Sequence, residues 1–300
     1  MATIHGVKHA APAFAVPAGA CDSHVHVFGP YDRFPLWAGR RYTPGPASVE
    51  DLLALQRALG LARVVVVQAS PQGTDNACLL DALQRLPAGG SQARGVAVID
   101  PHASDADLEA MHRAGVRGVR VNLESAGTHD PGVARRLLEE AAARVNPLGW
   151  HVQTYTTLPI LASVADTIRA LPAPLVIDHF GRPVAAYGVG QPGFDVLLAL
   201  VREGSAWVKL SAAYRISEHP DGADAAPLAR ALVDANPDRI LWGTDWPHPG
   251  GGLGPRSPDA VEPFFPIDDG RALNRLAEWI PDPVRLRKIL VDNPARLYDF

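Results

Sequence analysis

Short apolar runs rich in β-branched residues recur along the chain and alternate with segments of helical periodicity. Segments such as 48–60 and 131–149 place apolar residues at the three- and four-residue spacing of an amphipathic helix. Ser48, with Asp51 three residues later, forms a helix N-cap pattern at the start of the first of these segments. The apolar runs predict eight strands, at 20–27, 63–69, 94–99, 116–123, 150–155, 174–179, 206–211 and 239–245.

The predicted strands are apolar along nearly their whole length, which is typical of parallel strands covered on both faces. Eight such strands alternating with helices predict an α/β fold closed as a (β/α)8 TIM-type barrel. A doubly wound open sheet is the alternative, but no strand is followed by the Gly-x-Gly-x-x-Gly turn of dinucleotide-binding sheets. Since no linker, repeat or low-complexity stretch divides the chain, we expect a single domain: a flexible N-terminal arm at 1–17 and one barrel at 18–300.

Composition excludes several classes of protein. The 300 residues are 47% hydrophobic and 20% charged, an ordinary balance for a globular chain, and the net charge of −4 with no long basic run argues against nucleic-acid binding. No apolar stretch reaches the roughly 18–20 residues of a membrane span, and Pro12 and Pro17 interrupt the N-terminal apolar patch that could otherwise be a secretory signal. Two cysteines make no disulfide framework. We therefore expect a cytoplasmic protein that acts on a small molecule, as a monomer or a homo-oligomer.

Two connections are much longer than a barrel requires. Residues 28–47, rich in proline and glycine, follow the first predicted strand, and residues 246–268 follow the eighth. Loops at the carboxyl ends of barrel strands build the active site in this fold, and long loops there can close over it. We therefore expect the site at this end of the barrel, with a lid at 28–47.

Residues capable of acid–base or metal chemistry lie at the ends of three predicted strands. His24 and His26 are two apart on the first strand, so their side chains point to the same side. His179 ends the sixth strand and Asp245 ends the eighth. Each has an ordinary alternative, such as a hydrogen-bonded core histidine or an aspartate that caps a helix. Because the first and eighth strands are neighbours in a closed barrel, we expect all four groups to meet at one mouth.

The motifs DSHVHVFGP, VIDHFGRP, ILWGTDWPHP and the tail ILVDNPARLYDF resemble those of the amidohydrolase superfamily, in its amidohydrolase-2 branch, over about residues 18–300. Within that branch, RYTP at 41–44, VVQASPQGTDN at 66–76 and GVRGVRVN at 115–122 are similar to the lactone-hydrolysing group that includes 2-pyrone-4,6-dicarboxylate hydrolases. The resemblance implies a hydrolase that opens the ring ester of a small carboxylated lactone or pyrone, in the breakdown of aromatic or sugar acids.

The resemblance also implies roles for the residues at the mouth. Asp245 would be the general base that takes a proton from the attacking water. His24, His26 and His179 would either polarise the carbonyl oxygen directly or hold, together with Asp245, a single zinc ion. We expect no required metal. The alternatives are one zinc, in a zinc-dependent lactonase or a non-oxidative decarboxylase of the same branch, and a non-catalytic barrel that binds small acids.

A two-metal centre is not expected. Such centres in the superfamily need a Lys or Glu at the end of the fourth strand and a histidine at the end of the fifth. Here the fourth strand ends near Asn122 and the fifth ends in QTYTT. His151 opens the fifth strand, so it should lie at the end of the barrel away from the mouth.

Arginines and tyrosines indicate what the mouth would bind. A guanidinium binds a carboxylate through two hydrogen bonds, so several of them suit an anionic substrate. Arg120 ends the fourth predicted strand, and Arg182 and Arg215 follow the sixth and the seventh, all on the side of the mouth. The resemblance adds two tyrosines and a serine as substrate contacts. The candidate substrate-binding residues are Arg120, Arg182, Arg215, Tyr42, Ser70 and Tyr155.

One segment departs from the pattern of the dicarboxylate hydrolases. Those enzymes carry a second basic residue shortly beyond the arginine of the fourth strand, whereas this chain reads RVNLESAGTH there. Glu124 in that segment would repel a substrate carboxylate. We therefore expect a substrate with one fewer negative charge, or with that charge placed elsewhere.

Overall fold

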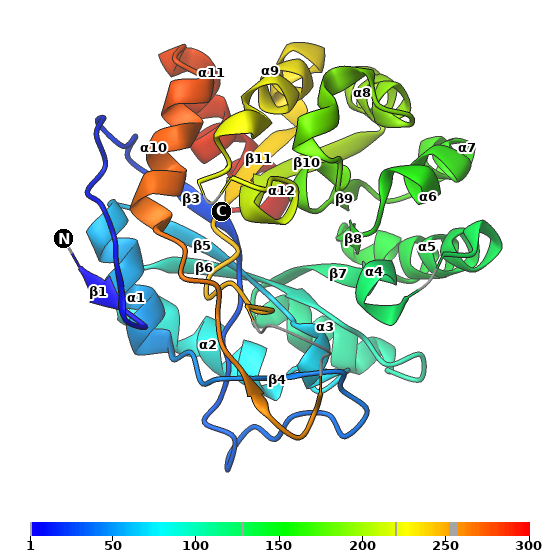
Figure 1. Ribbon diagram of the computed structural model, residues 1–300. Coiled ribbons are helices and arrows are strands. Elements are labelled where there is room, and N and C mark those ends of the chain that lie inside the picture. The colour runs from blue at the N-terminus through cyan, green and yellow to red at the C-terminus, as the bar shows by residue number, and fades with distance from the viewer. Residues whose placement is uncertain (1, 128, 220, 252–256) are drawn as a thin grey trace.

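Eight parallel strands form the centre of the computed structural model, which describes residues 2–127, 129–219, 221–251 and 257–300 (Figure 1). Neighbouring strands along the chain are also neighbours in the sheet. The strands are β3 (Cys21–Val25), β5 (Arg63–Val67), β6 (Gln92–Ala97), β7 (Val116–Asn122), β8 (His151–Tyr155), β9 (Leu175–Ile177), β10 (Ala206–Ser211) and β11 (Ile240–Gly243).

The sheet closes between its first and last strands. Val25, at the end of β3, forms a parallel bridge with Trp246, and the His26 N–H donates to the Trp246 carbonyl at 2.8 Å. The prediction of a single (β/α)8 barrel is therefore confirmed, and all eight predicted strands are present.

Helices surround the strands (Figure 1). They are α1 (Val49–Leu59), α2 (Ala77–Ala88), α3 (Asp105–Arg113), α4 (Leu123–Ala126), α5 (Pro131–Val145), α6 (Leu158–Ser163), α7 (Ala165–Ala170), α8 (Phe194–Glu203), α9 (Ala226–Ala235), α10 (Asp269–Trp279), α11 (Pro283–Arg287) and α12 (Asn293–Tyr298). Ser48 and Asp51 form the predicted capping box at the start of α1, each side chain bonding the backbone N–H of the other.

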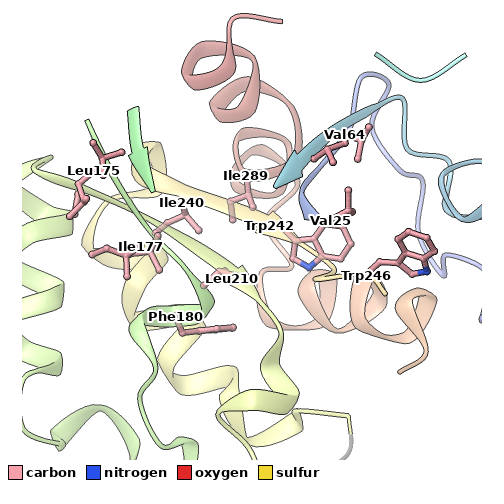
Figure 2. Packing of buried hydrophobic residues seen from close by; sticks show 14 of the residues in the cluster. Val25, Val64, Leu175, Ile177, Phe180, Leu210, Ile240, Trp242, Trp246 and Ile289 are labelled. Carbon is pink, nitrogen blue, oxygen red and sulfur yellow. The ribbon is translucent and has the colours of Figure 1, made fainter. Parts of the chain in front are cut away.

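The strands are apolar throughout because they have apolar surroundings on both faces. On β5, Val64 and Val66 belong to the large cluster between the strands and the helices, while Val65 and Val67 point into a second cluster inside the barrel. Figure 2 shows the first cluster, where Trp242 of β11 lies beside Ile289. Burial on both faces therefore gives the continuous apolar runs seen in the sequence.

The N-terminal segment packs against the barrel. Strands β1 (Thr3–Ile4) and β2 (Val7–Lys8) form a small hairpin. The Ala10 N–H donates to Asp268 at 2.9 Å, and the Ala13 N–H donates to the Asn274 side chain at 2.7 Å. The flexibility expected of the arm at 1–17 stays a prediction, but its described residues make these specific contacts.

The two long loops meet at the carboxyl end of the barrel. Strand β4 (Thr43–Pro44), from the loop 28–47, pairs with β12 (Val261–Glu262), from the loop that follows β11 (Figure 1). The Thr43 hydroxyl donates to the Pro258 carbonyl at 2.7 Å. Lid motion of 28–47 stays a prediction. Among the residues that the structure describes, no helix is both long and apolar enough to cross a membrane.

Candidate active site

Three imidazole rings converge on one carboxylate at the carboxyl end of the barrel. The Oδ1 atom of Asp245 lies 3.4 Å from Nε2 of His26 and 3.5 Å from Nε2 of His24. The same oxygen lies 3.8 Å from Nε2 of His179. All four side chains are buried. The groups meet because they lie at the ends of parallel strands that close into a barrel, as the sequence indicates.

The chain turns sharply where two of these residues leave their strands. The backbone φ is 70° at Asp245 and 52° at His179, in the left-handed region. Such a conformation costs energy for residues other than glycine and persists only where the surroundings enforce it. At Asp245 the N–H donates to the His24 carbonyl at 2.9 Å, and the carbonyl accepts from the His248 N–H at 2.8 Å. These bonds hold the carboxylate toward the rings.

The second oxygen of Asp245 has two donors of its own. Its Oδ2 accepts from the Tyr214 hydroxyl at 2.6 Å and from Nε of Arg215 at 2.9 Å. Burial alone would raise the pKa of Asp245, but the Arg215 guanidinium and the neighbouring imidazoles outweigh it and hold that pKa well below its usual value. Burial raises the pKa of Tyr214 well above its usual value, so the phenol keeps the proton it donates. Asp245 is therefore an ionised carboxylate in a fixed orientation.

Each histidine is anchored through Nδ1, which leaves Nε2 facing Asp245. Nδ1 of His26 lies 2.7 Å from the Val67 carbonyl, and Nδ1 of His24 lies 3.2 Å from the Asp178 carboxylate. Both partners only accept hydrogen bonds, so we assign the ring protons of His26 and His24 to Nδ1. In the neutral rings, the Nε2 lone pairs then point toward the carboxylate.

The third histidine has a freer choice of tautomer. Nδ1 of His179 lies 2.8 Å from the Ser211 hydroxyl, which can either donate or accept. His179 can therefore carry its proton on Nε2 and donate it at the mouth. Burial holds the pKa of His179 well below 6.5 and lowers that of His24 to about 3, so both rings stay neutral near pH 7.

A buried network of charged residues supports the site from inside the barrel. The Asp178 carboxylate accepts from Arg120 at 3.2 Å and lies 3.9 Å from Nζ of Lys209, in addition to its contact with His24. Nζ of Lys209 donates to Gln153 at 2.7 Å and lies 3.5 Å from Nδ1 of His24. Burial lowers the pKa of Lys209 to about 8. Asp178 therefore connects Arg120 to His24, since it contacts both.

A cavity of about 330 Å³ opens beside Asp245. The Tyr155 ring lies in its wall, 5.9 Å from the Arg120 guanidinium and 5.7 Å from that of Arg182. The predicted site residues that line the cavity are His26, His179, Asp245, Arg120, Arg182, Arg215, Tyr42, Ser70 and Tyr155. His24 lies behind this surface and is fully buried. It can therefore position Asp245 but does not face the cavity.

The comparison with known proteins identifies the family. The amidohydrolase family pattern (Amidohydro_2) matches residues 21–300. The chain belongs to the amidohydrolase family. It is 40% identical to a 2-pyrone-4,6-dicarboxylate hydrolase of Comamonas testosteroni, over 96% of this chain and 92% of the relative. It is 38% identical to a 4-sulfomuconolactone hydrolase of Rhizobium radiobacter, over 95% and 91% of the two chains.

A solved structure agrees with this assignment. A putative 2-pyrone-4,6-dicarboxylic acid hydrolase from Pseudomonas putida superposes with a TM-score of 0.77 at 34% identity, covering 95% of this chain and 98% of that one. The resemblance inferred from the sequence motifs is thereby confirmed at the level of the family and of the fold.

The structure of this amidohydrolase adds contacts that the motifs do not reveal. Arg215, expected to bind substrate, already bonds Asp245 and donates to the Pro249 carbonyl at 2.9 Å. Lys209 was not identified from the sequence, although a lysine inside an apolar strand run is a signal for a buried functional group. Tyr214, also missed, gives no such signal because tyrosines commonly pack in loops. His151 lies at the start of β8, where it stacks edge-on with Tyr298, away from the mouth.

The residues around Asp245 fit a divalent metal ion. The ligand atoms of His24, His26 and Asp245 lie within 4.8 Å of one another. The Nε2 atom of His24 is buried and has no hydrogen-bond partner among the described residues. Two imidazoles and a carboxylate are ordinary zinc ligands, and zinc-bound histidines usually donate their other N–H to a carboxylate or carbonyl, as His24 and His26 do here.

Proposed function

We propose that this amidohydrolase hydrolyses the ring ester of a small lactone that carries a carboxylate. The observation that supports this most strongly is the ionised Asp245, which faces an arginine-lined cavity from among three histidines. A pocket that only bound small acids would gain nothing from a carboxylate at its centre, because like charges repel. The named activities of the two relatives, both hydrolases, agree with this chemistry.

In the proposed reaction, Asp245 is the general base. Water lies between its Oδ1 and the lactone carbonyl carbon, and loses a proton to the carboxylate as it attacks. The negative charge that develops on the carbonyl oxygen is stabilised by donation from Nε2 of His179. The ring C–O bond then breaks, and the proton held by Asp245 passes to the leaving ring oxygen. The carbonyl carbon becomes a carboxylic acid, which releases its proton to solvent.

The low pKa of Asp245 limits how strongly it attracts that proton. General-base catalysis contributes about 10²- to 10⁴-fold, and a base with a depressed pKa falls in the lower part of that range. Orientation and charge stabilisation must therefore contribute much of the acceleration. The bonds from Tyr214 and Arg215 provide the orientation, because they fix the Asp245 carboxylate.

Arg120 is the proposed holder of the substrate carboxylate. It is buried in the cavity wall, where Asp178 and the Gln68 carbonyl hold the two terminal nitrogens of its guanidinium. Its Nε has no hydrogen-bond partner among the described residues. Because Arg120 lines the cavity and its guanidinium is held in place, it suits an anionic group that arrives with the substrate. Tyr42, Ser70 and Tyr155 are further proposed contacts along the same cavity.

A metal-dependent form of the same hydrolysis is the second candidate. It is favoured by the unpartnered Nε2 of His24 and by the two lone pairs that face Asp245. A divalent cation between these atoms would relieve their repulsion. His24, His26 and Asp245 would hold such an ion, with His179 nearby. When bound, zinc polarises a carbonyl and lowers the pKa of water.

The test is hydrolysis of 2-pyrone-4,6-dicarboxylate and of 4-sulfomuconolactone, followed by loss of ring absorbance. The enzyme is assayed as isolated and after exhaustive chelation, with metal content and CO2 release measured in parallel. Turnover that survives complete metal removal supports the metal-free form, whereas turnover lost on chelation and restored by one zinc per chain supports the second candidate. Release of CO2 without ring opening would contradict hydrolysis and indicate a decarboxylase.

A further inference from the structure

The wall of the cavity contains an acidic residue that the proposed reaction does not use. Glu124 lines the cavity, and its side chain is 26% exposed. Its Oε1 lies 3.8 Å from Nη2 of Arg182, whose other terminal nitrogen donates to the Arg215 carbonyl at 2.8 Å. Glu124 therefore lies where it can reach a bound substrate.

The backbone holds Glu124 at the cavity wall. The residue belongs to the single turn α4, directly after β7. Asn122 caps this turn by accepting from the Ser125 N–H at 2.9 Å. Gly127 ends it with φ of 69° and donates its N–H to the Glu124 carbonyl. Because both ends of the turn are held, the backbone of Glu124 stays at the cavity wall, within reach of Arg182.

Three arginines that line the cavity, Arg120, Arg182 and Arg215, face a carboxylate of the protein. Asp178 faces Arg120 and belongs to the buried network. Asp245 faces Arg215 and belongs to the proposed catalytic site. Glu124 has neither role, so its charge acts mainly on Arg182 and on the ligand. Arg41 also lines the cavity, from the loop 28–47.

A substrate with two anionic groups would place one of them beside Glu124. Arg120 and Arg182 line the same cavity, with their guanidiniums 5.9 and 5.7 Å from the Tyr155 ring, so the two ends of one substrate can reach both arginines. The group at Arg182 would share the guanidinium with Glu124 and meet its charge at a few ångströms, a repulsion that solvent screens only in part. A hydroxyl at the same place would instead donate a charge-assisted hydrogen bond to Glu124.

We propose that Glu124 makes this enzyme selective for lactones that carry one anionic group, held at Arg120, and a hydroxyl or similar donor directed at Glu124. This inference rests on the proposed lactone hydrolysis for its reaction, while the selectivity can also be measured by binding alone. At Glu124 a ligand hydroxyl gains a charge-assisted hydrogen bond, whereas a second anionic group meets a like charge, so the carboxylate favours the hydroxylated ligand.

The experiment compares wild type with Glu124→Gln, which removes the charge and keeps the shape. The matched control is Glu139→Gln, on the exposed face of α5, which makes the same change of charge outside the cavity. The substrates are D-galactarolactone, with one carboxylate and several hydroxyls, and 2-pyrone-4,6-dicarboxylate, with two carboxylates and no hydroxyl. Affinities are measured for a stable pair, 3-hydroxybenzoate and isophthalate, which differ only by a hydroxyl in place of a carboxylate.

We expect wild type to prefer the hydroxylated member of each pair. Two ratios are compared: kcat/KM for the two lactones and affinity for the two benzoates. Glu124→Gln should shift both ratios toward the dianion by about tenfold or more, because one like charge has gone. Glu139→Gln should leave both ratios unchanged. Equal ratios in wild type and Glu124→Gln would overturn the proposed selectivity while leaving lactone hydrolysis intact. A shift in binding without turnover of any lactone would retain the selectivity and contradict the proposed reaction.

Discussion

Replacement of Asp245 by Asn removes the proposed base and little else. The amide oxygen can keep the bonds from Tyr214 and Arg215, and the amide nitrogen then faces Nε2 of His26 and His24, which can accept from it. Shape and hydrogen bonding are thus nearly preserved. The carboxylate that takes the proton from water is lost.

The expected loss in kcat is about 10²- to 10³-fold, the lower part of the range for a positioned general base. This corresponds to about 3–4 kcal/mol of transition-state stabilisation. KM should change less than about threefold, because Arg120 rather than Asp245 holds the substrate carboxylate in the proposed complex. The ion pair with Arg215 becomes a hydrogen bond from the charged guanidinium to a neutral amide oxygen, which should lower stability by about 1–2 kcal/mol.

The assay measures kcat and KM from ring absorbance and the Tm from thermal unfolding. The control is Asp195→Asn, an exposed residue in the first turn of α8, which makes the same chemical change far from the cavity. The reasoning would be refuted if Asp245→Asn kept more than a tenth of wild-type kcat, or if it lost substrate affinity and turnover in parallel.

Four further predictions follow from the same geometry. Arg120→Met should raise KM by about 10- to 100-fold through loss of a charge-assisted hydrogen bond. Arg117→Met, on the same strand but paired with Asp299, should leave KM unchanged; equal effects would place Arg120 outside the binding site. The pKa values of Asp245 and His179 both lie well below their usual values, so Asp245 stays ionised and His179 stays neutral in mildly acidic solution. We therefore expect kcat/KM to stay flat as the pH falls from 7 to about 5. Titration with a midpoint near 6.5 would contradict this. Removal of the Ser211 hydroxyl, as Ser211→Ala, should lower kcat by about tenfold with little change in KM, because His179 loses the partner of its Nδ1; restoration by Ser211→Thr would distinguish positioning from packing. Finally, chelation should leave the Tm unchanged in the metal-free form, and a fall in Tm that added zinc reverses would show a resident ion.

Much of the fold followed from local patterns in the chain. The eight apolar runs became eight strands, since a strand buried on both faces must be apolar at nearly every position. The capping box at Ser48 and Asp51 formed as expected because it involves only neighbouring residues. The mouth residues His24, His26, His179 and Asp245 could be grouped by the rule that parallel strands end at the same side of a barrel.

Other contacts of the site depend on residues far apart in the chain. Arg215 reaches Asp245 across 30 positions, and Arg120 reaches Asp178 across 58. Nothing in the local pattern distinguishes an arginine that binds a substrate from one that holds a catalytic carboxylate, because both need the same residue at the end of a strand. The path of the loop and the rotamer decide between them.

Periodicity and strand-end chemistry by themselves determined the barrel, the end that carries the site and the residues that could meet there. The tertiary structure decided which atoms face each other. It places His24 behind the cavity, where Lys209 and Asp178 lie against His24, and it places Glu124 beside Arg182. The reason is physical. A repeating pattern of apolar positions specifies which face of an element is buried, whereas charge pairing over a few ångströms depends on how separate elements are brought together.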